Sequence, residues 1–127
     1  MRPCDQNCSL GDLLAAHRRW LDGESDGQQL DLSGANLSGA NLSRANLSNA
    51  HLTSANMCGT VLTSALLTCA VLSRTDLRSA DLTDADVTHA RLYGANMTGV
   101  DMRDVNLTDA NMKGANLRGA NLEGVLQ

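Results

Sequence analysis

An apolar residue recurs at every fifth position of this chain, nineteen times without interruption. We call this position i, and its members are Leu32, Leu37, Leu42, Leu47, Leu52, Met57, Leu62, Leu67, Leu72, Leu77, Leu82, Val87, Leu92, Met97, Met102, Leu107, Met112, Leu117 and Leu122. Fourteen of the nineteen residues at i−2 are alanine, and fourteen at i−1 are asparagine or aspartate. Serine or threonine occupies i+1 in twelve phrases, and glycine often follows at i+2. Such a fixed repeat decides the fold before any local pattern does.

A period of five residues fits neither an amphipathic α-helix nor a flat β-strand. Five residues advance an α-helix by about 140° beyond a full turn, so the apolar residues would spiral over every face. In a strand, an odd step puts successive residues on opposite faces. The pattern is satisfied if each five-residue phrase forms one side of a coil and turns a corner before the next. Side chains at i and i−2 then point inward, the others point outward, and coils stack about 4.8 Å apart as in a solenoid.

The repeated phrase resembles the pentapeptide repeat family. Residues 35–39 (Ala-Asn-Leu-Ser-Gly) and 115–119 (Ala-Asn-Leu-Arg-Gly) show it, and the resemblance covers residues 30–124. It implies an all-β solenoid, a right-handed quadrilateral β-helix with four phrases per coil, and hence nearly five coils in a rod about 23 Å long. The family often has phenylalanine at i, but this chain contains none. We therefore expect a core ladder of leucine and methionine, with Leu37, Leu42, Leu47, Leu52, Leu62, Leu67, Leu72, Leu77, Leu82, Leu92, Leu107, Leu117 and Leu122 as its leucines.

The segment before the repeats is expected to contain one helix, over about residues 9–22. Ser9 is a suitable N-cap, Asp12 lies in the first turn, and Gly23 is a C-terminal stop. A helix this short is marginal alone, so its apolar face must pack on something. We predict that it caps the first coil, because the open end of a solenoid favours association. The capping residues are expected to be Leu10, Leu13, Leu14, His17, Trp20 and Leu21, with the histidine and tryptophan as packing residues.

The chain then divides into three parts. Residues 1–29 form an N-terminal segment that ends in a hydrophilic linker, residues 30–124 form the repeats, and residues 125–127 form a short tail. A length of 127 residues suits a single domain. Aromatic residues make up only 2% of the chain, which would make a conventional globular core hard to build, whereas a solenoid of leucine and alanine needs none.

Charge and hydropathy limit the classes of partner. The net charge of −4 argues against a general affinity for nucleic-acid backbones. No run approaches the roughly 20 apolar residues of a membrane span. The first eight residues lack the apolar segment of a secretory signal. We therefore expect a cytoplasmic protein that binds neither membranes nor nucleic acid directly.

Metal, cofactor and catalytic chemistry are not indicated. Cys58 and Cys69 would lie two sides apart on a four-sided coil, Cys4 and Cys8 precede the repeats, and free thiols are expected. The spacings contain no CxxC and no paired histidines, so no metal or cofactor is expected. The repetition itself explains the abundant Asp, Asn, Ser and Thr residues, and a filled, convex solenoid has no cleft in which a pKa would be shifted. We expect no enzymatic activity.

Numbering the sides of the coil in fours separates the charges. Side one comprises the phrases centred on Leu32, Leu52, Leu72, Leu92 and Met112. Its polar residues include His51, Arg74, Arg91, Tyr93 and Lys113, with Asp31 as its acid. Side three, which starts at Leu42, is mainly acidic, with Asp81, Asp84, Asp101, Asp104 and Glu123 against Arg44 and Arg103, and side four adds Asp86 and Asp109 with His89. Two interpretations remain: a mixed solvated surface that maintains solubility, or a surface that steers a partner.

Five positions at i−1 depart from asparagine or aspartate, namely His51, Val61, Leu66, Val71 and Arg91. The three apolar ones are consecutive phrases and should point outward on three adjacent sides. Exposed apolar clusters usually contact something, which favours a partner or dimer contact. The alternative is partial burial between neighbouring coils. The candidate interaction surface is therefore Val61, Leu66, Val71, Arg74, Arg91, Tyr93 and Lys113.

Two functions from different classes follow. The first is a non-catalytic scaffold or protein-interaction module with an unknown protein partner, which could also form a homodimer through an uncapped C-terminal coil or the apolar residues. The second is implied by the resemblance: some pentapeptide repeat proteins are similar to duplex DNA in shape and charge and modulate type II topoisomerases such as gyrase. The short rod, the small net charge and the basic side one argue against that alternative.

Overall fold

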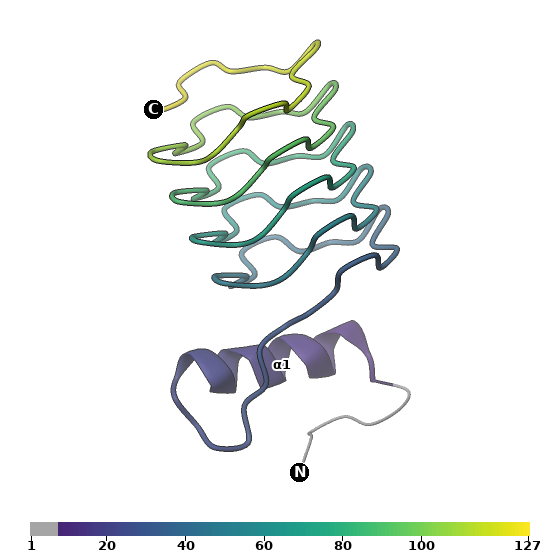
Figure 1. Cartoon of the computed structure of the whole chain (residues 1–127), viewed down its shortest axis with the longest axis vertical. Coiled ribbons are helices and arrows are strands. Elements are labelled where there is room, and N and C mark those ends of the chain that lie inside the picture. The colour runs from purple at the N-terminus through teal and green to yellow at the C-terminus, as the bar shows by residue number, and fades with distance from the viewer. Residues whose placement is uncertain (1–7) are drawn as a thin grey trace.

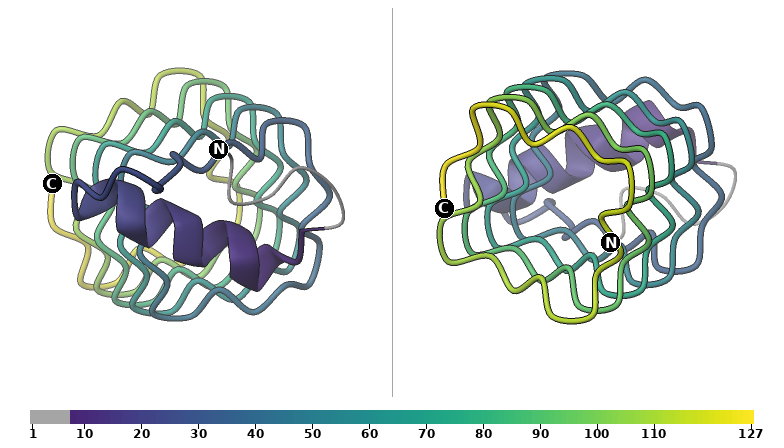
Figure 2. Two further views of the ribbon diagram at one scale, coloured as in Figure 1. Left: turned by 90° about the horizontal axis from the view of Figure 1, so that it is seen from below. Right: turned by 90° about the horizontal axis from the view of Figure 1, so that it is seen from above.

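The computed structural model describes residues 8–127. One helix, α1 (Leu10–Leu21), lies across one end of a stack of coils that extends to the other end of the chain (Figure 1). The coils superpose when viewed along the axis of the stack (Figure 2). Within the described residues the coils pair through sixteen isolated parallel bridges, and none of them contains a longer strand. Each side of a coil thus contributes one bridged residue, at i−1, and then turns.

The pairing has a constant register of twenty residues, so four phrases form each coil. Asp31 pairs with His51, and Val71 pairs with Arg91. The bonds alternate in direction along each side: Leu32 N–H donates to the His51 carbonyl at 2.8 Å, and His51 N–H donates to the Leu30 carbonyl at 2.9 Å. Residues at the same position of successive phrases on one side therefore form a column, with about 4.8 Å between neighbours.

The core contains the side chains at i and i−2. Leucines at i are at most 8% exposed from Leu37 to Leu92, and the alanines from Ala50 to Ala95 are also buried. Towards the C-terminal end Leu107 and Leu117 are only partly buried and Leu122 is 42% exposed, because few described residues lie beyond them along the stack. Thr60 and Thr75 replace alanine at i−2 and remain buried, since each hydroxyl donates to the carbonyl three residues before it.

Every corner uses the left-handed backbone region at i+2. All nineteen i+2 residues have φ between 58° and 75°, and eleven of them are not glycine. The N–H of the next i−2 residue closes the turn by donating to the carbonyl at i, as Ala35 does to Leu32 at 3.0 Å. Glycine is frequent at i+2 because it adopts a positive φ without the steric cost that a Cβ brings.

The preference for asparagine or aspartate at i−1 has a specific local cause. In all fourteen phrases with either residue, its Oδ1 accepts a hydrogen bond from the N–H at i+1, at 3.0 to 3.3 Å. Side chains of this type commonly bond the backbone two residues on, which stabilises a turn. The five other residues at i−1 cannot provide this carboxyl or amide oxygen. The preference for Asn or Asp at i−1 therefore reflects this side-chain cap as well as the outward orientation of the side chain.

The helix expected over residues 9–22 is present as α1. Ser9 Oγ accepts from Asp12 N–H at 3.0 Å, and the Asp12 carboxylate accepts from Ser9 N–H, which forms a capping box. Leu10, Leu13 and Leu14 pack against the core of the first coil. No helix within residues 8–127 is long and apolar enough to cross a membrane.

His17 joins α1 to the coils. It is fully buried, its Nδ1 accepts from Leu30 N–H at 2.9 Å, and its Nε2 lies 2.8 Å from the Ser48 carbonyl. These partners define the neutral tautomer with the proton on Nε2. The Trp20 ring stacks on the imidazole with centroids 5.5 Å apart. Burial lowers the pKa of His17 below 6.5, although the bond to the Ser48 carbonyl opposes that shift.

The hydrophilic linker packs closely on α1: Gln28 N–H donates to the Ala16 carbonyl, and a Cβ at Gly27 would overlap the main chain of Trp20. The expectation of free thiols is wrong for Cys8, which is disulfide-bonded, whereas Cys58 and Cys69 are free. The repeat keeps cysteines on different sides apart, but that constraint does not apply before the helix. Cys4 lies outside the described residues.

The side-chain cap can be tested at Asn96, whose Oδ1 accepts from both the N–H and the hydroxyl of Thr98. We expect Asn96→Ala to lower the free energy of unfolding by about 1 kcal/mol, because both donors lose their acceptor. Arg91→Ala is the matched control at an i−1 position without a cap, with an expected change below about 0.5 kcal/mol. Urea denaturation measures both, and equal losses would show that the cap contributes nothing.

The lowered pKa of His17 makes the stability depend on pH. The unfolded chain binds a proton at His17 as the pH falls through 6.5, whereas the folded chain binds it only at lower pH. The contribution is therefore complete above pH 6.5 and decreases as the pH falls towards the folded pKa. We expect His17→Gln to lose less stability than the wild type between pH 7.5 and pH 5 in urea denaturation. An unchanged pH dependence in His17→Gln would contradict this assignment.

Candidate functional site

Side one contains five of the seven residues of the candidate interaction surface. Val71, Arg74, Arg91, Tyr93 and Lys113 belong to three successive coils of this side, because the register advances by twenty residues. The four polar ones are exposed, and Tyr93 is 45% exposed. The register therefore places these residues on one face.

The apolar residues at i−1 do not form one patch. Val61 is bridged to Asn41 and Asp81 on side three, so polar residues flank it along the stack. Leu66 lies on side four between Asn46 and Asp86. Val61 and Val71 are partly buried, whereas Leu66 is 42% exposed. Partial burial between coils accounts for the valines, and only the leucine is an exposed apolar side chain.

Among the described residues, sides two and three each have one paired and one unpaired cation, and the unpaired ones are Arg118 and Arg44. Arg78 and Arg103 each pair with the aspartate two residues earlier, at 2.7 and 2.8 Å. The Arg78 guanidinium lowers the pKa of Asp76 to about 2.

Within residues 8–127, Arg74, Arg91 and Lys113 on side one have no ion-pair partner. The Arg74 side chain lies close to Gly94 of the next coil, where a Cβ would contact it. Asp31, the acid of side one, lies on the first coil. Side one is therefore a face of unpaired positive charge on a chain whose net charge is −4.

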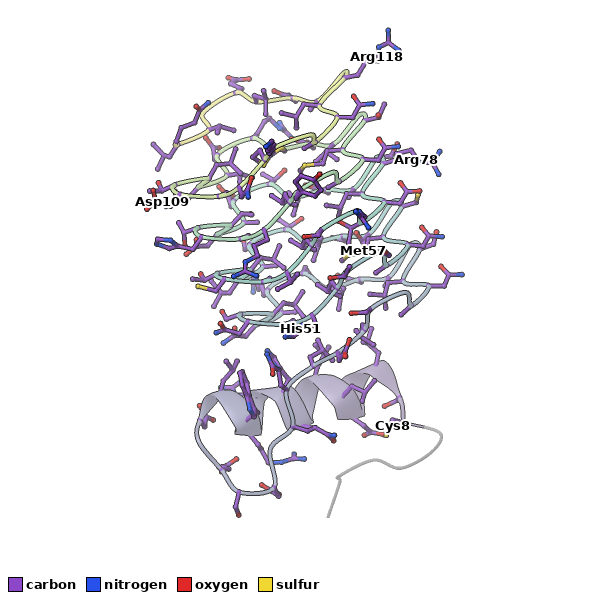
Figure 3. All side chains as sticks on the ribbon, in the orientation of Figure 1. Cys8, His51, Met57, Arg78, Asp109 and Arg118 are labelled. Carbon is purple, nitrogen blue, oxygen red and sulfur yellow. The ribbon has the colours of Figure 1, made fainter. Side chains whose placement is uncertain are left out.

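A polar hollow of about 340 Å³ lies where side four meets side one. It is lined by Gln29, Asn49, His51, Cys69, Val71, His89 and Arg91. His89 Nε2 is 3.7 Å from an Asp109 carboxylate oxygen. Figure 3 shows Asp109 at the opposite edge of the stack from Arg78 and Arg118, as expected for sides four and two. In the described part of the chain, no three His, Cys, Asp or Glu residues are placed to hold a metal ion.

On side one, three i−1 residues lack the side-chain oxygen that caps the turn, and the main-chain N–H two residues after each of them has no partner in the described residues. His51, Val71 and Arg91 occupy i−1 in three successive coils and are bridged to one another. The corresponding i+1 N–H groups, of Thr53, Ser73 and Tyr93, therefore have no acceptor within residues 8–127. We call these six residues the side-one strip. The sequence showed the departures from asparagine and aspartate, but their consequence for the N–H groups required the turn geometry.

A second hollow lies at the C-terminal end of the stack. Its volume is about 350 Å³, and its lining includes Leu107, Met112, Leu117 and Leu122. The N–H groups of Met112 and Leu117, which would pair with a further coil, have no acceptor among the described residues. This end therefore exposes apolar side chains together with unpaired main-chain groups.

Comparison with known proteins places these features in a family. The profile of pentapeptide repeats matches residues 31–68, 59–92 and 88–124, with eight copies. A sequence comparison with functionally curated proteins found no match.

Among solved structures, the cyanobacterial protein HetL has extensive similarity. HetL of Nostoc sp. strain PCC 7120 is a pentapeptide repeat protein involved in heterocyst differentiation regulation. It is 32% identical over 92% of this chain, with a TM-score of 0.76. The present chain spans about half of HetL, 48% of its length.

Two further structures are similar at lower TM-scores. A pentapeptide repeat protein from the thylakoid lumen of Arabidopsis thaliana is 36% identical over 79% of this chain and 70% of its own, with a TM-score of 0.43. QnrB1, a plasmid-mediated fluoroquinolone resistance protein, is 20% identical over 75% of this chain and 59% of its own, with a TM-score of 0.37. No functional argument rests on these two. The family profile, which spans nearly all of the repeats, shows that this chain belongs to the pentapeptide repeat family, whose members fold as right-handed β-helices.

Proposed function

We propose that this repeat scaffold is a non-catalytic interaction module that binds an acidic protein partner through side one. The observation that supports the proposal is the set of three exposed cations, Arg74, Arg91 and Lys113, without ion-pair partners in the described residues. Unpaired charge on one face accelerates encounter with a partner of opposite charge and suppresses wrong partners. Tyr93 adds an exposed aromatic side chain with a polar end to the same face.

In this proposal the architecture provides a rigid support. The β-helix of residues 30–124 has nearly five coils, and α1 acts as its N-terminal cap. Packing of Leu10, Leu13 and Leu14 on the core and the two bonds of His17 support that role for α1. A support that does not rearrange reduces the entropic cost of binding, so fewer contacts are needed for a given affinity.

The alternative, a DNA-like modulator of a type II topoisomerase such as gyrase, would need a strongly acidic face. Side three is the most acidic side, but its Asp101 is paired with Arg103. Side one has the opposite sign. We therefore do not propose the alternative, and gyrase is included below as a specific candidate partner.

Self-association would use other surfaces. The C-terminal hollow contains apolar side chains and unpaired main-chain groups, and Leu66 is exposed on side four. A homodimer through either would leave side one free for its partner. Sedimentation equilibrium of the wild type and of Leu66→Asn distinguishes these two surfaces from each other.

The cytoplasmic location expected from the sequence remains a prediction. Cys8 is disulfide-bonded, and disulfides are rare in cytosolic proteins. Fractionation of host cells is the measurement that decides it.

The proposal predicts that the double variant Arg74→Glu with Lys113→Glu no longer binds the partner protein. Arg44→Glu with Arg118→Glu is the matched control, because it changes the net charge equally at the same two phrase positions on other sides. We expect the amount of partner that co-purifies from host lysate to fall at least tenfold for the side-one pair and to stay unchanged for the control. Raising the salt concentration should release the same protein. Equal recovery with both variants would remove side one as the binding face, and gyrase subunits are quantified in the same samples.

A further inference from the structure

The three turns of the side-one strip lack an acceptor oxygen that fourteen of the nineteen phrases have. Fourteen phrases place an Asn or Asp oxygen 3.0 to 3.3 Å from the i+1 nitrogen. At Thr53, Ser73 and Tyr93 no such oxygen is present among the described residues. The turn geometry at these phrases is the same, since their i+2 residues, Ser54, Arg74 and Gly94, have φ of 59°, 58° and 66°. Each phrase of the strip is therefore a turn with a vacant position for one acceptor oxygen.

The vacancies are aligned, and cations lie beside the second and third of them. Asp31, whose Oδ1 caps its own turn, lies next to the first. Because bridges join His51 to Val71 and Val71 to Arg91, the three N–H groups form a column with about 4.8 Å between neighbours. Arg74 and Arg91 lie on the same side of the coils, and Lys113 extends this side by one coil. Thr53 and Ser73 are partly exposed and Tyr93 is exposed, so an external oxygen displaces no hydrogen bond within the described protein.

We propose that the side-one strip binds carboxylates of an acidic α-helix of a partner protein, whose oxygens take the place of the missing Asn or Asp oxygens. This inference depends on the proposed function, because it assigns the structure of the partner that side one binds. A carboxylate is the ligand that suits both features of the strip, since it accepts from main-chain N–H groups and pairs with guanidinium and ammonium groups. The Asn or Asp side chains of the other phrases already fill the equivalent position internally.

The spacing of the strip selects a helix rather than a strand. Along a helix, residues three apart are separated by about 4.5 Å and residues seven apart by about 10.5 Å. One and two steps of the strip are about 4.8 and 9.6 Å, so glutamates at spacings of three and four residues on one helix face match all three vacancies. Alternate residues of a strand are about 6.8 Å apart and lose register after one step. The partner helix would lie parallel to the axis of the β-helix.

The remaining uncapped phrases do not form a second strip. The N–H groups of Thr63 and Thr68 also have no acceptor among the described residues, but they lie on sides three and four. Val61 and Leu66 are each followed on the next coil by an aspartate, Asp81 or Asp86, whose Oδ1 caps its own turn. An isolated vacancy beside a carboxylate does not favour an acidic ligand. These two phrases therefore provide controls with the same chemistry off the strip.

The probe is a blocked, alanine-rich peptide of about 18 residues, long enough to be helical, with three glutamates at spacings of three and four residues. Its isomer has the same composition with the glutamates distributed around the helix. Both are titrated at low salt into the full ¹⁵N-labelled chain. We expect the first peptide to shift the amide signals of Thr53, Ser73 and Tyr93 and to leave those of the capped Thr83 and Thr98 unchanged. The isomer should bind about tenfold more weakly.

Val71→Asn is the decisive variant, because it supplies the missing oxygen from within the chain. We expect it to weaken peptide binding about tenfold without lowering the thermal unfolding midpoint, since the new side chain caps Ser73 N–H. Leu66→Asn is the matched control: it adds the same cap on side four and should leave peptide binding unchanged. Loss of binding with an intact midpoint excludes unfolding as the cause.

The other outcomes separate this inference from the proposed function. Binding that is weakened by Arg74→Glu with Lys113→Glu but not by Val71→Asn would overturn the role of the N–H groups, while side one would still be the binding face. Equal binding of the two peptides would overturn the helical spacing. No binding of either peptide would overturn the inference as a whole, and co-purification with the charge variants would then test the proposed function independently.

Discussion

The twenty-residue register of main-chain hydrogen bonds is the constraint on which the rest of this structure depends. Each phrase donates to the next coil and accepts from it at fixed positions, as Leu32, His51 and Leu30 illustrate. Because the register never shifts, a residue's number determines its side and its column. Leucine ladders, alanine ladders and charged columns all follow from this one rule. A shift of one phrase would move each charged residue to the neighbouring side while the apolar residues still faced the core, so hydrophobic burial alone does not define the surface.

The register can persist only if every corner turns in the same way, and two local devices ensure this. A residue at i+2 adopts the left-handed region, which is unfavourable for the eleven residues that are not glycine. The cap from i−1 to the N–H at i+1 stabilises fourteen of the corners. Where both glycine and the cap are missing, as around Val71 and Arg74, the neighbouring coils must impose the turn. The conformation of these turns is therefore imposed by the neighbouring coils rather than by the local sequence. Their outward side chains and i+1 N–H groups are left available for recognition.

The sequence predicted the inward and outward positions, the helix over residues 9–22 and its N-cap, because these depend on periodicity and local propensity. It also assigned charges to sides correctly once four phrases per coil were taken from the family resemblance. It did not predict the bonds from His17 to Leu30 and Ser48, because they join segments whose separation depends on how the helix docks. The overlap that a Cβ at Gly27 would cause has the same origin. The disulfide of Cys8 and the partial burial of Val61 and Val71 depend on three-dimensional packing that the repeat pattern does not specify.

The same geometry explains why such a scaffold suits recognition better than catalysis. Outward side chains stand on a convex surface about 4.8 Å apart along each column, too regular to converge on one reacting atom. A partner with a matching repeat, however, meets several identical positions at once, and each contact orders the next. Paired cations such as Arg78 and Arg103 contribute little to this, because their aspartates already satisfy them. Side one is different because its three cations and three successive i+1 N–H groups all lack partners within the described residues. The interactions that a ligand would make with them therefore replace only interactions with solvent.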